Sequence, residues 1–224
     1  MTAEFDRYGQ TYERAVDEAI AFAGREHGFY LEAKARRLFA LARRFVGPGR
    51  PRALDVGCGP GSFDRHVSSA FELYGVDVSP AMVEHARAAN PGVEYAVSEE
   101  RRLPHADGAF DLAFAVCVLH HVAAADRLPL LREMRRVVRP GGLVAVFEHN
   151  PWNPLTRRVV RACAFDEDVE LIPRRELASL LRRAGLDVFR TEYLLFVPWR
   201  ADALERMLRR LPLGAQYVVA GRRA

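Results

Sequence analysis

The feature that most constrains the fold is a regular alternation of short apolar runs with segments of helical periodicity. The apolar runs predict strands at 53–56, 73–76, 93–97, 110–119, 143–147, 186–196 and 216–220. The helical segments between them lie at 62–70, 80–89, 126–138 and 174–184. Alternating strands and helices form a parallel sheet with helices on both faces. We therefore expect an α/β protein that binds its ligands where the strands end.

The N-terminal segment precedes this pattern. Amphipathic helices are predicted at 4–23 and 28–46, and Gly47-Pro48-Gly49 ends the second of them. The whole chain of 224 residues suits one domain with a small addition. We expect an N-terminal helical lid at 1–47 and a ligand-binding domain at 48–224.

The composition excludes several classes of protein. No run approaches the ~18–20 apolar residues of a membrane span, and the polar, acidic N-terminus predicts no secretory signal. The three cysteines are scattered without a CxxC pair, which fits a reduced protein and gives no zinc pattern. We expect a cytoplasmic protein that binds no membrane.

The positive charge is a weak indicator of partners. Lys and Arg number 33 against 29 acidic residues, and Lys34 is the only lysine. An arginine excess of this kind is typical of a GC-rich genome, and the Arg pairs along the chain suit solvated helix faces. Because no stacking or groove-reading motif accompanies them, we expect no nucleic-acid partner.

A glycine loop follows the first predicted strand. It reads Asp55-Val56-Gly57-Cys58-Gly59-Pro60-Gly61 and leads directly into a helix. Its glycines permit positive φ and a close approach of the backbone to a ligand. The spacing is GxGxG, whereas a dinucleotide fingerprint reads GxGxxG, and the Asp55 carboxylate would repel a pyrophosphate. The loop therefore suits a ligand with a positive amino group and argues against a nucleotide-cofactor oxidoreductase.

Asp77 ends the second predicted strand. A carboxylate at this place can accept hydrogen bonds from both hydroxyls of a ribose. Asp77 could instead be the N-cap of the helix that follows, but Ser79, followed by Pro80, is the better cap. We expect Asp77 to bind a ligand.

These motifs resemble the class I S-adenosylmethionine (SAM)-dependent methyltransferases. The resemblance rests on four segments in order: 56–61, 75–79, Leu103-Pro104 before Phe110-Asp111, and 139–142. It implies SAM as the cofactor and a Rossmann-like, doubly wound, mostly parallel seven-stranded sheet. It covers residues 50–148 well and the rest of the chain loosely.

The resemblance also implies roles for single residues. The methionine part of SAM is expected at Asp55, Gly57, Gly59 and Gly61, the ribose at Asp77 with Val78 beside it, and the adenine at Glu99. Ser98 stands where the family more often has glycine, and Glu100 is the fallback for the adenine. Leu119 and His120 are expected to border the cofactor.

Two histidines are candidates for a general base. Strand alternation predicts that His120 and His121 point to opposite sides, which leaves His121 free to face an acceptor. Asn150-Pro151 predicts that the fifth strand ends near His149, so that its imidazole can turn inward. We rank His149 first and His121 second, beside the alternative that no base is needed.

The sequence assigns fewer residues to the acceptor than to the cofactor. Tyr8, Tyr12 and Tyr30 suit either a lid over the substrate or packing of the N-terminal helices, and Asn150 is expected near the substrate. Asp166 and its acidic neighbours are expected to be solvated, and no metal is predicted. Cys117 is expected to be a small buried residue within its strand, not a nucleophile.

The sequence thus predicts a methyltransferase that modifies an oxygen or nitrogen atom of a small biosynthetic acceptor, as a monomer or homodimer. Nucleic-acid methylation is disfavoured because His120-His121 stand where DNA N-methylating enzymes carry an Asn/Asp-Pro-Pro-Tyr type motif. C-methylation and a non-catalytic SAM-binding module remain as alternatives.

Overall fold

The computed structural model describes residues 12–21, 26–163, 165–166, 169–195 and 207–224. The strands are β1 Arg52–Val56, β2 Glu72–Asp77, β3 Glu94–Val97, β4 Phe110–Val116, β5 Val138–His149, β6 Leu186–Leu194 and β7 Gln216–Arg223. The helices are α2 Tyr12–Ile20, α3 His27–Phe45, α4 Asp64–Val67, α5 Pro80–Ala89, α6 Ala124–Val137, α7 Pro154–Ala162 and α8 Arg174–Arg183.

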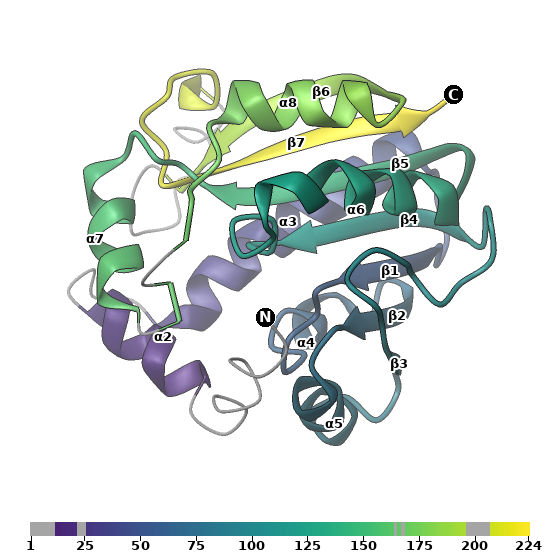
Figure 1. The fold of residues 1–224 in the computed structure, drawn as a ribbon, viewed down its shortest axis with the longest axis horizontal. Coiled ribbons are helices and arrows are strands. Elements are labelled where there is room, and N and C mark those ends of the chain that lie inside the picture. The colour runs from purple at the N-terminus through teal and green to yellow at the C-terminus, as the bar shows by residue number, and fades with distance from the viewer. Residues whose placement is uncertain (1–11, 22–25, 164, 167–168, 196–206) are drawn as a thin grey trace.

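The strands form one seven-stranded sheet in the order β3-β2-β1-β4-β5-β7-β6 (Figure 1). β1 to β5 pair in parallel, and β7 lies antiparallel between β5 and β6. The expected Rossmann-like, mostly parallel, doubly wound sheet is confirmed. The chain winds outward in two directions from the neighbouring strands β1 and β4, and ligand crevices form at such switch points.

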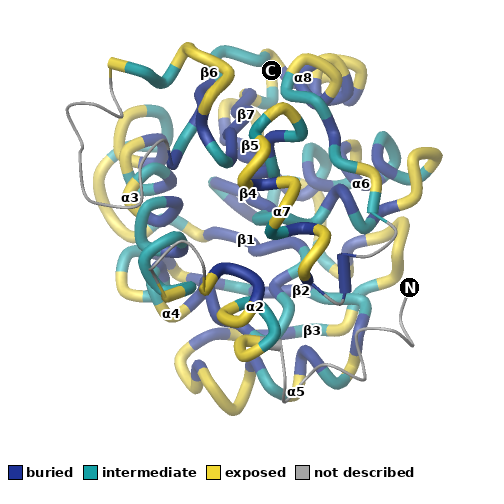
Figure 2. Tube along the Cα trace, turned by 90° about the vertical axis from the view of Figure 1, so that its left-hand side faces the viewer, coloured by how far each residue is buried: buried dark blue, intermediate teal, exposed yellow. Residues whose placement is uncertain are grey.

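Two apolar layers cover the two faces of the sheet, as expected. One face packs against α6 and α8 through side chains such as Leu131 and Leu181. The other packs against α3, α4 and α5 through Leu38, Val67 and Val83. Figure 2 shows the central strands as buried, with exposed residues on the outer sides of the helices.

The N-terminal helices serve two different purposes. Leu38 and Leu41 of α3 are fully buried against the sheet, so the C-terminal half of α3 belongs to the core layer. The helix α2 contacts α3 and α7. In Figure 1, α2 and α7 lie beyond the arrowheads of β4 and β5, where a covering element would have to be.

Several elements differ from the sequence expectation, among them α4, β4 and α7. The helix expected at 62–70 is only the short α4. The strand β4 ends at Val116, because Cys117 has a φ of 58° and a left-handed residue breaks the ladder. The helix α7 was not expected; Asn153 caps it by accepting from the Thr156 N–H, and Pro154 occupies its first turn.

No helix among the described residues combines the length and apolar character needed to cross a lipid bilayer.

Tyr217 anchors the segment that follows α7 to the sheet. Its hydroxyl donates to the Ile172 carbonyl at 2.5 Å, in a fully buried setting. Replacing Tyr217 by Phe leaves this carbonyl without that donor, and we expect the free energy of unfolding to fall by ~1–2 kcal/mol in urea denaturation. The control Tyr74→Phe, whose hydroxyl bonds to Glu72 in an exposed pair, should lose less. Equal losses in the two variants would contradict the anchoring role.

Candidate active site

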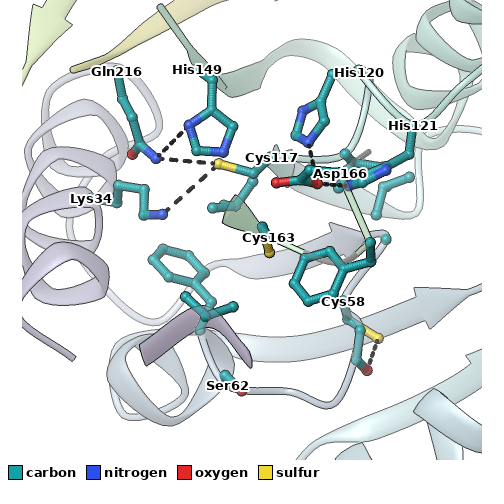
Figure 3. A pocket seen from close by; sticks show the side chains of 18 of the residues that line it. Lys34, Cys58, Ser62, Cys117, His120, His121, His149, Cys163, Asp166 and Gln216 are labelled. Carbon is teal, nitrogen blue, oxygen red and sulfur yellow. Dashed lines mark hydrogen bonds and ion pairs between the residues drawn. The ribbon is translucent and has the colours of Figure 1, made fainter. Parts of the chain in front are cut away.

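A cavity of about 550 Å³ lies at the carboxyl ends of the strands around the switch point. The strand ends and the loops after β1, β2, β4 and β5 form its floor, and side chains of α2, α3 and α7 contribute to its wall. Figure 3 shows the labelled side chains that point toward it. The cavity therefore lies where the α/β pattern predicts a ligand site.

The glycine loop forms one wall of the cavity. Gly57 and Gly59 line it with φ values of 78° and 53°, which glycine adopts without strain. A Cβ on Gly57 would lie 2.6 Å from the Val118 side chain, whereas a Cβ on Gly59 would meet nothing within 4 Å. The backbone at Gly59 is thus open to an incoming ligand.

Gly61 does not line the cavity, so the expected ligand contact is not found there. A Cβ at this glycine would lie 2.4 Å from the Asn90 amide nitrogen, which donates to the Gly61 carbonyl at 3.1 Å. Gly61 is needed because the loop packs closely against α5.

Asp77 braces the same loop and faces the cavity. One carboxylate oxygen accepts from the Gly59 N–H at 2.9 Å, and the other accepts from the Ser79 N–H at 2.9 Å. Ser79 caps α5 through the Met82 N–H, as expected. The Asp77 side chain therefore sets the loop conformation as well as the charge at this wall.

Asp55 brings a second carboxyl group to this wall. It is 2% exposed, and its Oδ1 accepts no hydrogen bond from the described residues. Burial, with Asp64 and Asp77 nearby, raises the pKa of Asp55 well above its ordinary value. A buried, unsatisfied carboxyl group at a cavity wall fits a cationic group of a ligand.

The other expected cofactor contacts divide into two groups. Val78 and Glu99 line the cavity, as do Ser98 and Glu100. Leu119 does not: it is fully buried in the core, and its backbone N–H donates to Glu148 at 2.7 Å. Leu119 is therefore placed as a structural residue, contrary to the expectation.

His120 and His121 point the same way, so the expectation from strand alternation is wrong. They lie after the end of β4 in a turn, and their ring centroids are 4.1 Å apart. Both Nε2 atoms face the same oxygen of Asp166, at 3.7 and 3.2 Å. Asp166 is only 6% exposed, so the expectation that it is solvated is also wrong.

Glu148 fixes the position of the first of these two histidines. Its fully buried carboxylate lies 2.7 Å from His120 Nδ1 and also accepts from the Leu119 N–H. Burial opposes a charge on His120, but Glu148 and Asp166 outweigh it and raise the pKa of His120 to about 10.

His149, the first candidate base, lines the cavity beside His120, and the centroids of the two rings are 5.2 Å apart. Its Nδ1 is 3.3 Å from the Gln216 amide nitrogen, which is also 3.5 Å from Cys117 Sγ. Burial and the nearby charge of His120 lower the pKa of His149 to about 4, so its ring is neutral at neutral pH.

Lys34 completes this part of the wall. Its ammonium group, on a residue 4% exposed, lies 4.0 Å from Cys117 Sγ (Figure 3). Cys117 is not inside β4 as expected but follows it and lines the cavity, and burial raises the pKa of its thiol. Sequence reasoning missed Lys34 and Gln216; the one available signal was that Lys34 is the only lysine in an arginine-rich chain.

The residues expected near an acceptor lie in different places in the structure. Tyr30 lines the cavity, Tyr8 lies outside the described residues, and Tyr12 begins α2. Asn150 does not line the cavity, because its amide donates to the Pro212 and Gly214 carbonyls and caps a turn at the Trp152 N–H. Asn150 therefore connects loops instead of facing a substrate.

Known proteins resemble this chain in both sequence and fold. Residues 54–146 match a family model described as a methyltransferase domain. The chain is 28% identical over 206 residues to ajmaline N-methyltransferase of Rauvolfia serpentina, covering 84% of this chain and 64% of that protein. It is 33% identical over 135 residues to malonyl-(acyl-carrier protein) O-methyltransferase of Pseudescherichia vulneris, covering 59% and 53%. The chain thus spans less than two thirds of the length of either relative.

A solved structure from Thermotoga maritima has the same fold. It is described as a SAM-dependent methyltransferase and possible histamine N-methyltransferase. The TM-score is 0.72 at 23% identity, and the match covers 100% of both chains.

Asp64, the buried first residue of α4, gives a testable pH dependence. Burial raises its pKa from 3.8 to about 6. A carboxyl group whose pKa is higher in the folded state binds more protons when folded, so its contribution to stability is lost as the pH rises through this range. The stability of the wild type relative to Asp64→Asn should therefore fall by ~1–3 kcal/mol between about pH 4 and pH 7.

Urea denaturation at a series of pH values measures this difference. The control is Asp187→Asn on an exposed position of β6, for which we expect no such trend. A difference between wild type and Asp64→Asn that stays constant with pH would show that Asp64 titrates normally.

Proposed function

From the premise that residues 54–146 form a class I, SAM-dependent methyltransferase domain, we propose that the chain transfers a methyl group to an oxygen or nitrogen atom of a small molecule. One observation carries the proposal: a single cavity joins the glycine loop and Asp77 to a wall formed by His149, Lys34 and Gln216. Its volume of about 550 Å³ is in the range of small-molecule sites.

The residues around the glycine loop fit the groups of SAM. The unsatisfied carboxyl of Asp55 suits the amino group, and the Asp77 carboxylate suits the ribose hydroxyls. The open backbone at Gly59 allows close approach, and Val78 and Glu99 lie toward the expected adenine. When bound, SAM supplies a methyl group already activated on a sulfonium.

The protein must then position the acceptor. Methyl transfer needs a nucleophile about 3 Å from the methyl carbon and in line with the leaving sulfur, so placement supplies much of the rate. The apolar side chains of Val16, Ile20 and Val159 bring α2 and α7 to the cavity and would exclude water around an acceptor with an apolar body. This supports a lid role for the N-terminal region.

His149 is the base that the geometry favours if the acceptor must lose a proton. Its ring lies on the cavity wall, and Nε2 can take a proton in the tautomer that keeps the hydrogen on Nδ1, with the side-chain oxygen of Gln216 as the acceptor for that hydrogen. His121 is the second candidate, but its Nε2 already faces Asp166.

Two of the relatives are an N-methyltransferase and an O-methyltransferase, which supports nitrogen and oxygen over carbon as the acceptor atom. The GxGxG spacing and the buried Asp55 disfavour a dinucleotide oxidoreductase. A non-catalytic SAM-binding module is the remaining rival.

Calorimetric titration with SAM and with NAD, followed by transfer of labelled methyl groups to a metabolite extract, tests the proposal. We expect the chain to bind SAM but not NAD, and we expect the labelled methyl group to appear in small molecules. Binding of SAM without transfer would favour the non-catalytic module, and binding of NAD alone would refute the assignment.

Gly59→Val should abolish SAM binding. The added side chain would enter the cavity from a backbone with a φ of 53°, which a β-branched residue adopts only with strain. Gly92→Val, on an exposed loop where a Cβ would meet nothing within 4 Å, should bind SAM like the wild type. Calorimetry on both variants, with circular dichroism to verify folding, measures the effect. Wild-type affinity in a folded Gly59→Val protein would mean that the cofactor lies elsewhere.

His149→Ala should lower turnover by roughly 10²–10⁴-fold while SAM affinity is retained, because only proton removal from the acceptor is lost. The acceptor found in the extract is the substrate for this measurement. His85→Ala, on α5 away from the cavity, should turn over like the wild type. If His149→Ala also retains its turnover, catalysis depends on placement and not on this base.

A further inference from the structure

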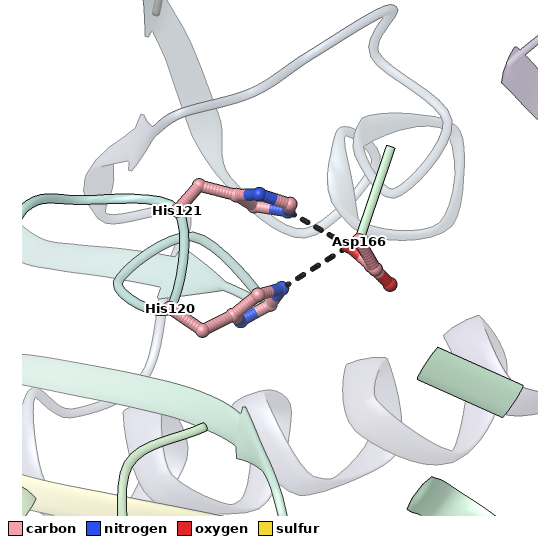
Figure 4. A group of neighbouring side chains, drawn as sticks. All are labelled: His120, His121 and Asp166. Atoms are coloured by element: carbon pink, nitrogen blue, oxygen red, sulfur yellow. Dashed lines mark ion pairs between the residues drawn. The ribbon is translucent and has the colours of Figure 1, made fainter. Parts of the chain in front are cut away.

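We propose that His120, His121 and Asp166 form a binding site for a divalent first-row transition-metal ion in the cavity wall (Figure 4). No metal is expected from the sequence, since Asp166 and its acidic neighbours are interpreted there as solvated. The proposal goes beyond methyl transfer and does not depend on it.

The distances among the three side chains match those of metal ligands. Asp166 Oδ1 lies 3.2 Å from His121 Nε2 and 3.7 Å from His120 Nε2. One ligand atom from each residue lies within 4.8 Å of the others. Ligands at 2.0–2.1 Å in a tetrahedral site are about 3.3 Å apart, so small side-chain shifts suffice to hold an ion.

Glu148 orients the first histidine for this role. It lies 2.7 Å from His120 Nδ1, and its own position is fixed by the Leu119 N–H. A carboxylate on one imidazole nitrogen fixes the tautomer and directs the other nitrogen to the metal, as in many histidine sites. Here the other nitrogen, Nε2, faces Asp166 (Figure 4).

An ion pair alone does not account for the arrangement. A protonated His120 between Glu148 and Asp166 would explain one contact. The imidazole nitrogen of His121 also faces the same carboxylate oxygen, so two nitrogens and one oxygen converge as a shared cation requires. That oxygen is buried, and its partners among the described residues are the two imidazole nitrogens, which a cation between the three groups would bind together with it.

The donor set defines the class of ion. Two imidazoles and one carboxylate suit Zn²⁺, Fe²⁺ or Co²⁺, whereas Mg²⁺ and Ca²⁺ prefer oxygen ligands. Three protein ligands leave at least one coordination position open. Because all three residues line the cavity, this position would take a water molecule or an oxygen or nitrogen atom of a small molecule bound there.

Metal titration of the chain without a histidine tag, after treatment with a chelator, tests the site. We expect calorimetry to find one Zn²⁺ per chain, and Co²⁺ to give visible absorption bands of a low-coordinate site with nitrogen ligands. Asp166→Asn and His121→Gln should each weaken Zn²⁺ binding at least about tenfold. His85→Gln, on α5 outside the cavity, should bind like the wild type.

Absence of stoichiometric Zn²⁺ binding by the wild type would overturn the proposal. So would unchanged affinity in folded Asp166→Asn and His121→Gln, or loss of affinity in His85→Gln alone. If the two site variants fail to fold, the Co²⁺ spectrum of the wild type decides, because bands typical of octahedral oxygen ligation also refute the site. SAM titration of the same metal-free protein reports separately on the proposed function.

Discussion

The carboxylate of Glu148 joins the ends of the two central strands and much of the site depends on it. It is fully buried at the end of β5, and it accepts from the backbone of Leu119 and lies against His120 in the turn after β4. A buried charge of this kind is stable only while its partners stay in place, since an unpaired one costs several kcal/mol. The turn after β4 is therefore held in the conformation that brings His120 and His121 toward Asp166.

The cavity has two chemically different halves. Around the glycine loop, Asp55 and Asp77 give a wall of carboxyl groups suited to a cationic cofactor. Across it, Lys34 and the histidines give a wall of nitrogen donors and bases. The half proposed to hold the cofactor (the cofactor half) is built from consecutive strand ends. The half proposed to hold the acceptor (the acceptor half) combines residues from α3, β5, β7 and the loop after α7. Because of this difference, the sequence predicts more residues of the cofactor half than of the acceptor half.

The cofactor half could be predicted because its residues follow strands directly. The position of Asp77 at the end of β2, and of Ser79 as the cap of α5, follows from local patterns. Gly61 was assigned to the ligand because a glycine motif does not say which face each residue presents; close packing against Asn90 explains this one. The alternation argument failed for His120 and His121 because the left-handed Cys117 ends β4 three residues earlier than the apolar run suggests.

The sequence by itself determined the order of strands and helices, the glycine loop and its acidic partners, because these depend on contacts within a few residues or on strand ends that meet at one edge of a parallel sheet. Only the tertiary structure decided the composition of the acceptor half. Lys34, Gln216 and Asp166 approach the ends of β4 and β5 from distant parts of the chain. Such contacts are set by how α3, β7 and the loop after α7 pack on the sheet, and no local periodicity encodes that packing.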